Sequence, residues 1–133
     1  MIRVFVDTSA VLAFLVPSDA SHERARSAFA RLQAMEAALV TSSYVLVELY
    51  ALLTRRFGLE QVISFRRDFC PLLDVIWVGR DVHEKGLDLL IQREQRKLSL
   101  VDATSFVLAR ERSIDQVFAY DSHFEQEGFA ILS

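Results

Sequence analysis

The sequence predicts an α/β fold in which a central, mainly parallel β-sheet is flanked by helices. Apolar runs of strand length alternate with longer segments whose apolar residues recur at helical spacing, a pattern typical of parallel sheets. The first run, residues 2–6, is apolar apart from Arg3 and does not alternate, which suits a strand buried on both faces. It leads directly into Asp7, and a later apolar run, residues 116–120, leads in the same way into Asp121.

The other elements follow from apolar spacing and from residues that end helices. Pro17 and Pro71 each stop the helix before them, and Gly58 has the position of a C-terminal glycine. Trp77, in the third predicted strand, is expected in the core. Strands are expected at residues 2–6, 39–41, 74–78, 116–120 and 128–132, and helices at residues 9–15, 21–37, 44–57, 58–69, 81–94 and 99–112.

Composition indicates one soluble globular domain spanning residues 1–133. Hydrophobic residues make up 52% of the chain and charged residues 25%, which excludes a disordered chain. The net charge of -3 argues against a protein that coats nucleic acid by bulk charge. Cys70 is the single cysteine, so no internal disulfide can form, and this fits a reducing cytoplasm. No apolar run is long enough to span a membrane, which takes about 18 residues.

Three aspartates occupy positions where structural and functional roles both fit. Asp7 and Asp121 follow buried strands, and each can cap the helix after it. Asp102 lies three residues after Ser99, which matches a capping box with aspartate in place of glutamate. Each aspartate taken alone is explained by capping, so a functional site requires that the three lie close together in the folded chain.

Glu48 interrupts the apolar face of the helix predicted at residues 44–57. A carboxylate that is partly removed from water needs a cation, a hydrogen-bond donor or a metal as its partner. One interpretation is an ion pair at the edge of the apolar face with Arg55 or Arg56. The other is a shared site with the three aspartates.

Strand ends and helix starts meet along one edge of a parallel sheet, so these acids are expected to converge there. Four neighbouring carboxylates repel one another and raise one another's pKa values. Mg²⁺ or Mn²⁺ relieves that repulsion by binding carboxylate oxygens and water. Such sites hydrolyse phosphodiesters, in some enzymes with two metals roughly 3.5–4 Å apart.

The acidic segments together resemble the PIN-domain nucleases, most closely the VapC-like toxins of bacterial toxin–antitoxin pairs. The matching segments are Val4–Ser9, Glu48, Leu98–Ala103 and Tyr120–Phe124, in the family's order and spread over the chain. The resemblance implies a PIN-like three-layer sandwich and an endoribonuclease that depends on Mg²⁺ or Mn²⁺. It also implies that the catalytic and metal-binding residues are Asp7, Glu48, Asp102 and Asp121, supported by the hydroxyl of Ser9.

Two positions depart from the family pattern. Ala119 stands where many members carry threonine, and His123 stands where some carry a further acid. A site that binds one metal at rest is compatible with these departures.

The resemblance further implies an RNA substrate, a homodimer and a small antitoxin protein that blocks the site. The basic residues just before the segment of Asp102 are candidates for RNA binding: Arg93, Arg96 and Lys97.

Other classes fit less well. A haloacid-dehalogenase-type phosphatase needs a second aspartate where Ser9 stands, and a response-regulator receiver needs an acidic pair after its first strand. The main alternative is a catalytically weak PIN-like module that binds RNA or protein. Such a module has no reason to retain four mutually repelling acids, so the nuclease is the favoured interpretation.

Overall fold

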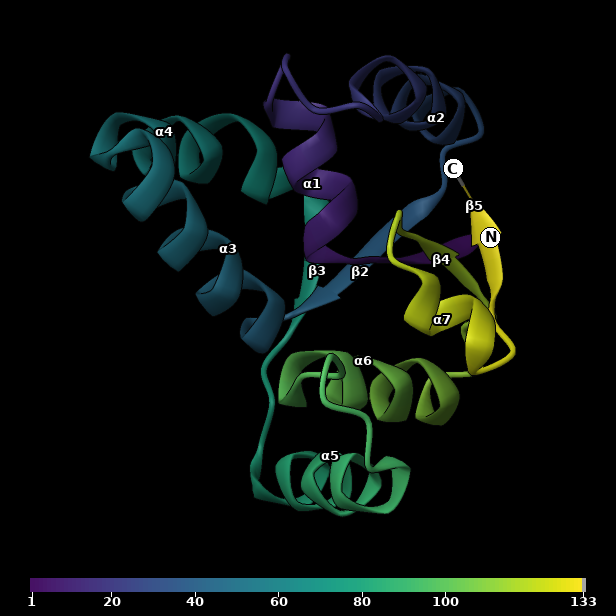
Figure 1. Cartoon of the computed structure of the whole chain (residues 1–133). Helices are drawn as coiled ribbons and strands as arrows, with labels where there is room; N and C mark the ends of the chain where they lie inside the picture. The colour runs from purple at the N-terminus through teal and green to yellow at the C-terminus, as the bar shows by residue number, and fades with distance from the viewer. Residues whose placement is uncertain (133) are drawn as a thin grey trace.

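The computed structural model contains a five-stranded sheet in which every neighbouring pair of strands is parallel, covered by helices on both faces (Figure 1). It describes residues 1–132. The strand order is β3-β2-β1-β4-β5, which confirms the predicted fold class. The strands are β1 (Arg3–Val6), β2 (Ala38–Ser42), β3 (Leu73–Ile76), β4 (Gln116–Phe118) and β5 (Ala130–Leu132).

The helices connect these strands in the order that the sequence predicts. The predicted helix at residues 58–69 begins as an α-helix and then widens to a π-helical turn at Phe65–Phe69, followed by a 3-10 turn at Cys70–Leu72 that contains Pro71. The α-helices are α1 (Thr8–Leu15), α2 (His22–Ala34), α3 (Ser43–Phe57), α4 (Leu59–Ser64), α5 (Arg80–Arg93), α6 (Leu100–Glu111) and α7 (Ser122–Gln126).

Alternate strand residues pack on opposite faces of the sheet, as the pleat of a β-strand requires. Val4 and Val6 contribute to the cluster that contains residues of α1, α2 and the Phe65–Phe69 turn. Phe5 lies between them in sequence and contributes to the second cluster, with residues of α6 and α7. The sheet is therefore the middle of three layers, with α1 and α2 on one side and α5 and α6 on the other (Figure 1).

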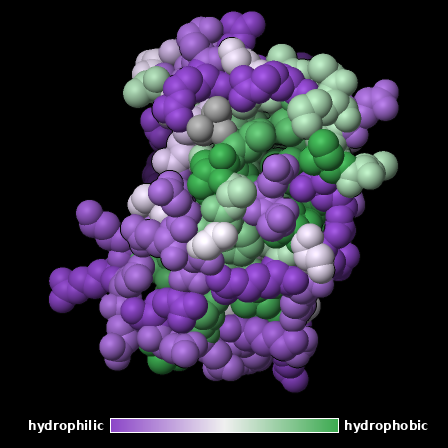
Figure 2. All heavy atoms as spheres, turned by 90° about the vertical axis from the view of Figure 1, so that its right-hand side faces the viewer, coloured by the Kyte–Doolittle hydropathy of each residue, from purple (hydrophilic) through white to green (hydrophobic). Residues whose placement is uncertain are grey.

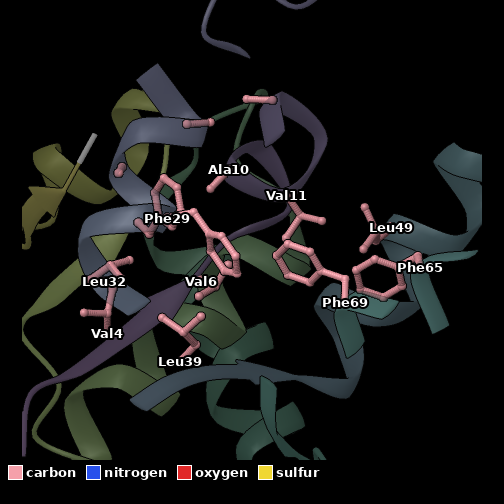
Figure 3. Packing of buried hydrophobic residues seen from close by; sticks show 14 of the residues in the cluster. Val4, Val6, Ala10, Val11, Phe29, Leu32, Leu39, Leu49, Phe65 and Phe69 are labelled. Atoms are coloured by element: carbon pink, nitrogen blue, oxygen red, sulfur yellow. The ribbon is translucent and has the colours of Figure 1, made fainter. Parts of the chain in front are cut away.

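Aromatic rings fill much of the first cluster (Figure 3). Phe69 stacks on Phe29 with ring centroids 5.1 Å apart and on Phe65 with centroids 5.4 Å apart. Such pairs add to the free energy that burial of the rings provides. The contact between Phe29 and Phe69 joins α2 to the turn after α4. Because α3 lies between α2 and α4 in the chain, this contact limits where α3 can lie.

Some predicted boundaries differ from the structure. The helix predicted at residues 21–37 ends at Ala34, because Glu36 has a left-handed backbone with φ of 54°. The prediction that Trp77 lies in the core is wrong, since its side chain is 76% exposed. The edge strand β3 ends at Ile76, and Trp77 lies in the segment that leads away from the sheet to α5.

The side of the molecule that carries β5 and the N-terminus shows hydrophobic surface between hydrophilic regions (Figure 2). β5 pairs only with β4, so it is an edge strand, and Ile131 and Leu132 are half-buried. Within residues 1–132 no helix has the length and apolar character needed to cross a bilayer.

Candidate functional site

The predicted acids line one pocket at the carboxyl edge of the sheet. β1 and β4 are adjacent, with Val6 opposite Phe118, so the segments that follow them begin side by side. Asp7 comes directly after β1, and Asp121 comes shortly after β4. The pocket has a volume of about 300 Å³, and its charged and hydroxyl-bearing lining residues are Asp7, Thr8, Ser9, Glu48, Lys97, Ser99, Asp102 and Asp121.

Asp7 is the most buried of these acids, with 3% of its surface exposed. It is the N-cap of α1, and its Oδ2 atom accepts hydrogen bonds from the Ser9 backbone N–H at 3.2 Å and the Ser9 hydroxyl at 2.6 Å. The Ser9 hydroxyl in turn accepts a hydrogen bond from the Tyr120 N–H at 3.0 Å. Both of Asp7's hydrogen bonds are to Oδ2, so the cap leaves Oδ1 for another partner.

Asp102 forms the predicted capping box at the start of α6. Its Oδ2 atom accepts from the Ser99 N–H at 3.1 Å, and its own N–H donates to the Ser99 hydroxyl at 3.0 Å. Asp121 caps α7, where its Oδ1 atom accepts from the His123 N–H at 2.7 Å. Capping and a place in the pocket are therefore compatible, because each cap uses one oxygen of a carboxylate that has two.

Glu48 reaches the pocket from α3, which is capped by the Ser42 hydroxyl. The alternative that Glu48 pairs with Arg55 or Arg56 is wrong, because no ion pair of Glu48 occurs among residues 1–132. Its charged neighbours are Asp102 and Asp121. The hydroxyl of Thr8 lies close enough to lower the pKa of Glu48 in part, although no hydrogen bond of ordinary geometry joins them.

The pKa values of Asp7, Glu48 and Asp102 are all raised. Burial raises the pKa of Asp7 from 3.8 to about 7, and the charges of Asp102 and Asp121 add to the rise. The hydrogen bonds from Ser9 lower this pKa and so offset part of the shift. Burial also raises the pKa values of Glu48 and Asp102, and the charge of Asp121 adds to both shifts. The protein thus concentrates carboxylates where their charge is unfavourable, and a cation would offset that cost.

His123 belongs to the same site, although its position in the sequence does not predict a role there. Asp102, Asp121 and His123 each offer one ligand atom, and these atoms all lie within 4.8 Å of one another. Two carboxylates and an imidazole form a donor set that binds divalent cations. The hydroxyl oxygen of Thr8 at the same pocket is buried without a hydrogen-bond partner. The residues present therefore fit a divalent metal ion.

The candidate RNA-binding residues have different surroundings. Lys97 lines the acidic pocket. Arg96 is exposed and forms no ion pair within residues 1–132. Arg93 donates two hydrogen bonds to the carboxylate of Glu127, at 2.7 and 3.0 Å. Lys97 therefore has the position that best suits a phosphate near the acids.

Comparison with known proteins agrees with this arrangement. The PIN domain family profile matches residues 4–129, so the chain belongs to the PIN domain family. It is 34% identical over 128 residues to the 23S rRNA-specific endonuclease VapC20 of Mycobacterium tuberculosis (strain CDC 1551 / Oshkosh), covering 95% of each chain.

Solved structures give the same fold. The crystal structure of Mycobacterium tuberculosis VapC20, described as a toxin that cleaves the sarcin-ricin loop, aligns with a TM-score of 0.82 and covers 96% of each chain at 34% identity. The DNA-bound VapBC of Salmonella typhimurium aligns with a TM-score of 0.72 at 16% identity, covering 98% of this chain and 97% of that one.

Proposed function

We propose that this chain is an RNA endonuclease of the VapC type, the toxin of a toxin–antitoxin pair, and that its cleavage of phosphodiester bonds depends on Mg²⁺ or Mn²⁺. The observation that carries the proposal is the convergence of Asp7, Glu48, Asp102 and Asp121 on one pocket. The similarity to an rRNA endonuclease over 95% of the chain supports RNA as the substrate.

The proposed role of each residue follows from its position in the pocket and from the hydrogen bonds that its side chain already makes. Asp102 and Asp121 would hold the cation through their carboxylate oxygens. Glu48, on α3, adds negative charge to the same pocket. Asp7 lines the same pocket with its Oδ1 atom free of hydrogen bonds, so this atom can bind the cation or accept a proton from the attacking water. When bound, the cation polarises water and the phosphate and stabilises the charge that develops on the leaving oxygen.

Substrate and partners are proposed on the same basis. A structured RNA loop fits, since unstacked bases in loops can be read by a surface site. A small antitoxin protein fits because solved relatives include VapBC complexes. We further propose that residues 1–133 act as one nuclease domain, that the protein forms a homodimer, and that it works in the cytoplasm.

The test is cleavage of 23S rRNA and of sarcin-ricin loop oligonucleotides with Mg²⁺, with Mn²⁺ and with EDTA. Glu48→Gln should lower the cleavage rate at least a hundredfold, because it removes charge from the pocket while keeping the shape of the side chain. Glu60→Gln is the matched control, since Glu60 is exposed on α4. RNA that is bound and never cut, with or without metal, would favour the binding module and contradict the proposal.

A further inference from the structure

The tightest group of metal-ligating atoms in the site is not formed by the acids alone. Asp102, Asp121 and His123 bring one ligand atom each to within 4.8 Å of one another. Asp102 and Asp121 were predicted as ligands from the sequence, whereas His123 replaces an acid of the family pattern. The donor set at this point therefore contains nitrogen as well as oxygen.

The imidazole of His123 is held in place by its surroundings. The backbone N–H of His123 donates to Asp121 Oδ1 at 2.7 Å, which fixes the backbone of the first turn of α7. The side chain is only 17% exposed, and its Nε2 atom lies 3.6 Å from Asp121 Oδ1. The Nδ1 atom is buried and has no hydrogen-bond partner among the described residues.

The separation of 3.6 Å is informative because it is too long for an ordinary hydrogen bond. Two atoms that bind one cation at about 2.1 Å each lie roughly 3.0–3.5 Å apart. The Nε2–Oδ1 spacing of 3.6 Å is slightly longer than this range, so a small side-chain movement would bring both atoms to ligand distance of a common ion. Asp102 approaches the same imidazole, because its carboxylate oxygen, the Asp121 oxygen and the His123 nitrogen all lie within 4.8 Å of one another.

We infer that His123 is a nitrogen ligand of the bound cation, and that the site selects a first-row transition-metal dication over Mg²⁺. This inference rests on the proposed function for the presence of a metal. Mg²⁺ is bound by oxygen ligands and retains several waters, so an imidazole adds little to its affinity. Imidazole nitrogen binds the transition-series dications well, so His123 raises their affinity selectively.

The experiment compares Mn²⁺ with Mg²⁺ on the metal-free protein, without RNA. Titration calorimetry gives both dissociation constants, and pulsed electron paramagnetic resonance detects nitrogen coupled to bound Mn²⁺. The wild type should bind Mn²⁺ at least tenfold more tightly than Mg²⁺ and show coupling to one imidazole nitrogen. His123→Asp should lose the coupling, and its preference for Mn²⁺ should fall about tenfold or more, which is the usual effect of altering a metal site's surroundings. His22→Asn is the matched control and should behave as wild type.

The outcomes separate this inference from the proposed function. Bound Mn²⁺ without nitrogen coupling in the wild type overturns the inference, and so does a His123→Asp protein that keeps the wild-type preference. Absence of any metal binding overturns it as well. Nitrogen coupling in a wild-type protein that cleaves no RNA supports the inference and contradicts the nuclease instead. Thermal melts in EDTA check that each variant folds. If His123→Asp does not fold, the resonance spectrum of the wild type alone still shows whether a nitrogen binds the Mn²⁺.

Discussion

Ser9 and Tyr120, which are 111 residues apart in the sequence, are joined by a hydrogen bond of 3.0 Å from the Tyr120 N–H to the Ser9 hydroxyl. The same hydroxyl donates to Asp7 Oδ2 at 2.6 Å. One side chain therefore connects the acid at the end of β1 to the backbone that leads from β4 into Asp121. Ser9 is thus a positioning residue that sets the distance between two acids of the site.

Replacing Ser9 with alanine should lower kcat for RNA cleavage by about 10–100-fold, the usual effect of removing a group that orients a ligand. Both hydrogen bonds from Ser9 lower the pKa of Asp7, so their partial loss should move the acidic limb of the pH–rate profile to higher pH. Ser9→Thr keeps the hydroxyl and should restore the rate and the profile. An alanine variant with the wild-type profile would show that Ser9 does not position Asp7.

The metal-free protein should lose stability as the pH rises from about 4 to about 8. The folded-state pKa of Asp7 is raised from 3.8 to about 7, so between these values the folded state binds more protons than the unfolded state. The stabilising effect of the proton is complete below pH 4 and is lost as the pH passes through 7. A pKa unit corresponds to about 1.4 kcal/mol, so the loss amounts to at most about 4 kcal/mol.

Asp7→Asn provides the control for this pH dependence. Asparagine caps helices as well as aspartate does and does not titrate, so the variant should show a flatter stability curve in EDTA. Urea unfolding at several pH values measures both proteins. Identical slopes for the wild type and the variant between pH 5 and pH 8 would contradict the raised pKa.

Lys97 and Arg93 should respond differently to mutation. Lys97 lines the acidic pocket, so Lys97→Glu should raise KM for RNA at least tenfold and reduce the salt dependence of binding. Arg93→Ala breaks one of the two ion pairs of Glu127, whose pKa Arg93 and Arg110 together hold at about 2, and should mainly lower the melting temperature. Arg26→Glu, on exposed α2 surface, serves as the control for charge reversal. A Lys97→Glu protein with unchanged salt dependence would place the RNA elsewhere.

Gly86 allows α5 to pack closely on α6. A Cβ atom at Gly86 would lie 2.6 Å from Thr104 Oγ1 and 3.2 Å from Thr104 Cα. Gly86→Ala should therefore destabilise the protein by about 1–3 kcal/mol, as overpacking of a core does. Thr104→Ala removes a hydroxyl that has no hydrogen-bond partner, so the double variant should recover part of the loss. Equal stability of the single and double variants in denaturant melts would contradict this account of the packing.

The sequence predicts the fold well because its local signals agree with one another. Buried strands correspond to continuous apolar runs. Helices end close to Pro17 and at Gly58, and α6 begins at the capping box of Ser99. The prediction for Trp77 fails because the exposure of its side chain depends on where the edge strand β3 ends. No local sequence pattern specifies that end. The pairing of Arg93 with Glu127 also depends on tertiary structure, because the two residues are 34 positions apart and meet only in the folded chain.

The acidic part of the site is predictable for a similar reason. Asp7 and Asp121 follow strands, and strands of a parallel sheet end at a common edge. His123 could be noticed from sequence only as a departure from a family pattern. Its position in the first turn of the short helix α7 gives no indication of which way the ring points. The cap that Asp121 makes with the His123 backbone N–H fixes only the backbone of this turn, so the direction of the ring depends on packing in the folded protein.

The most direct test of the central claim is RNA cleavage by Asp7→Asn, paired with thermal melts in EDTA and in Mn²⁺. Asp88→Asn, on the exposed side of α5, is the matched control and should cleave as wild type does. If Asp7 acts in a metal-dependent site, Asp7→Asn should abolish cleavage, melt higher than wild type in EDTA, and gain less stability from Mn²⁺. A variant that cleaves RNA at nearly the wild-type rate, with a melting temperature that rises with Mn²⁺ as the wild type's does, would show that Asp7 is only a helix cap.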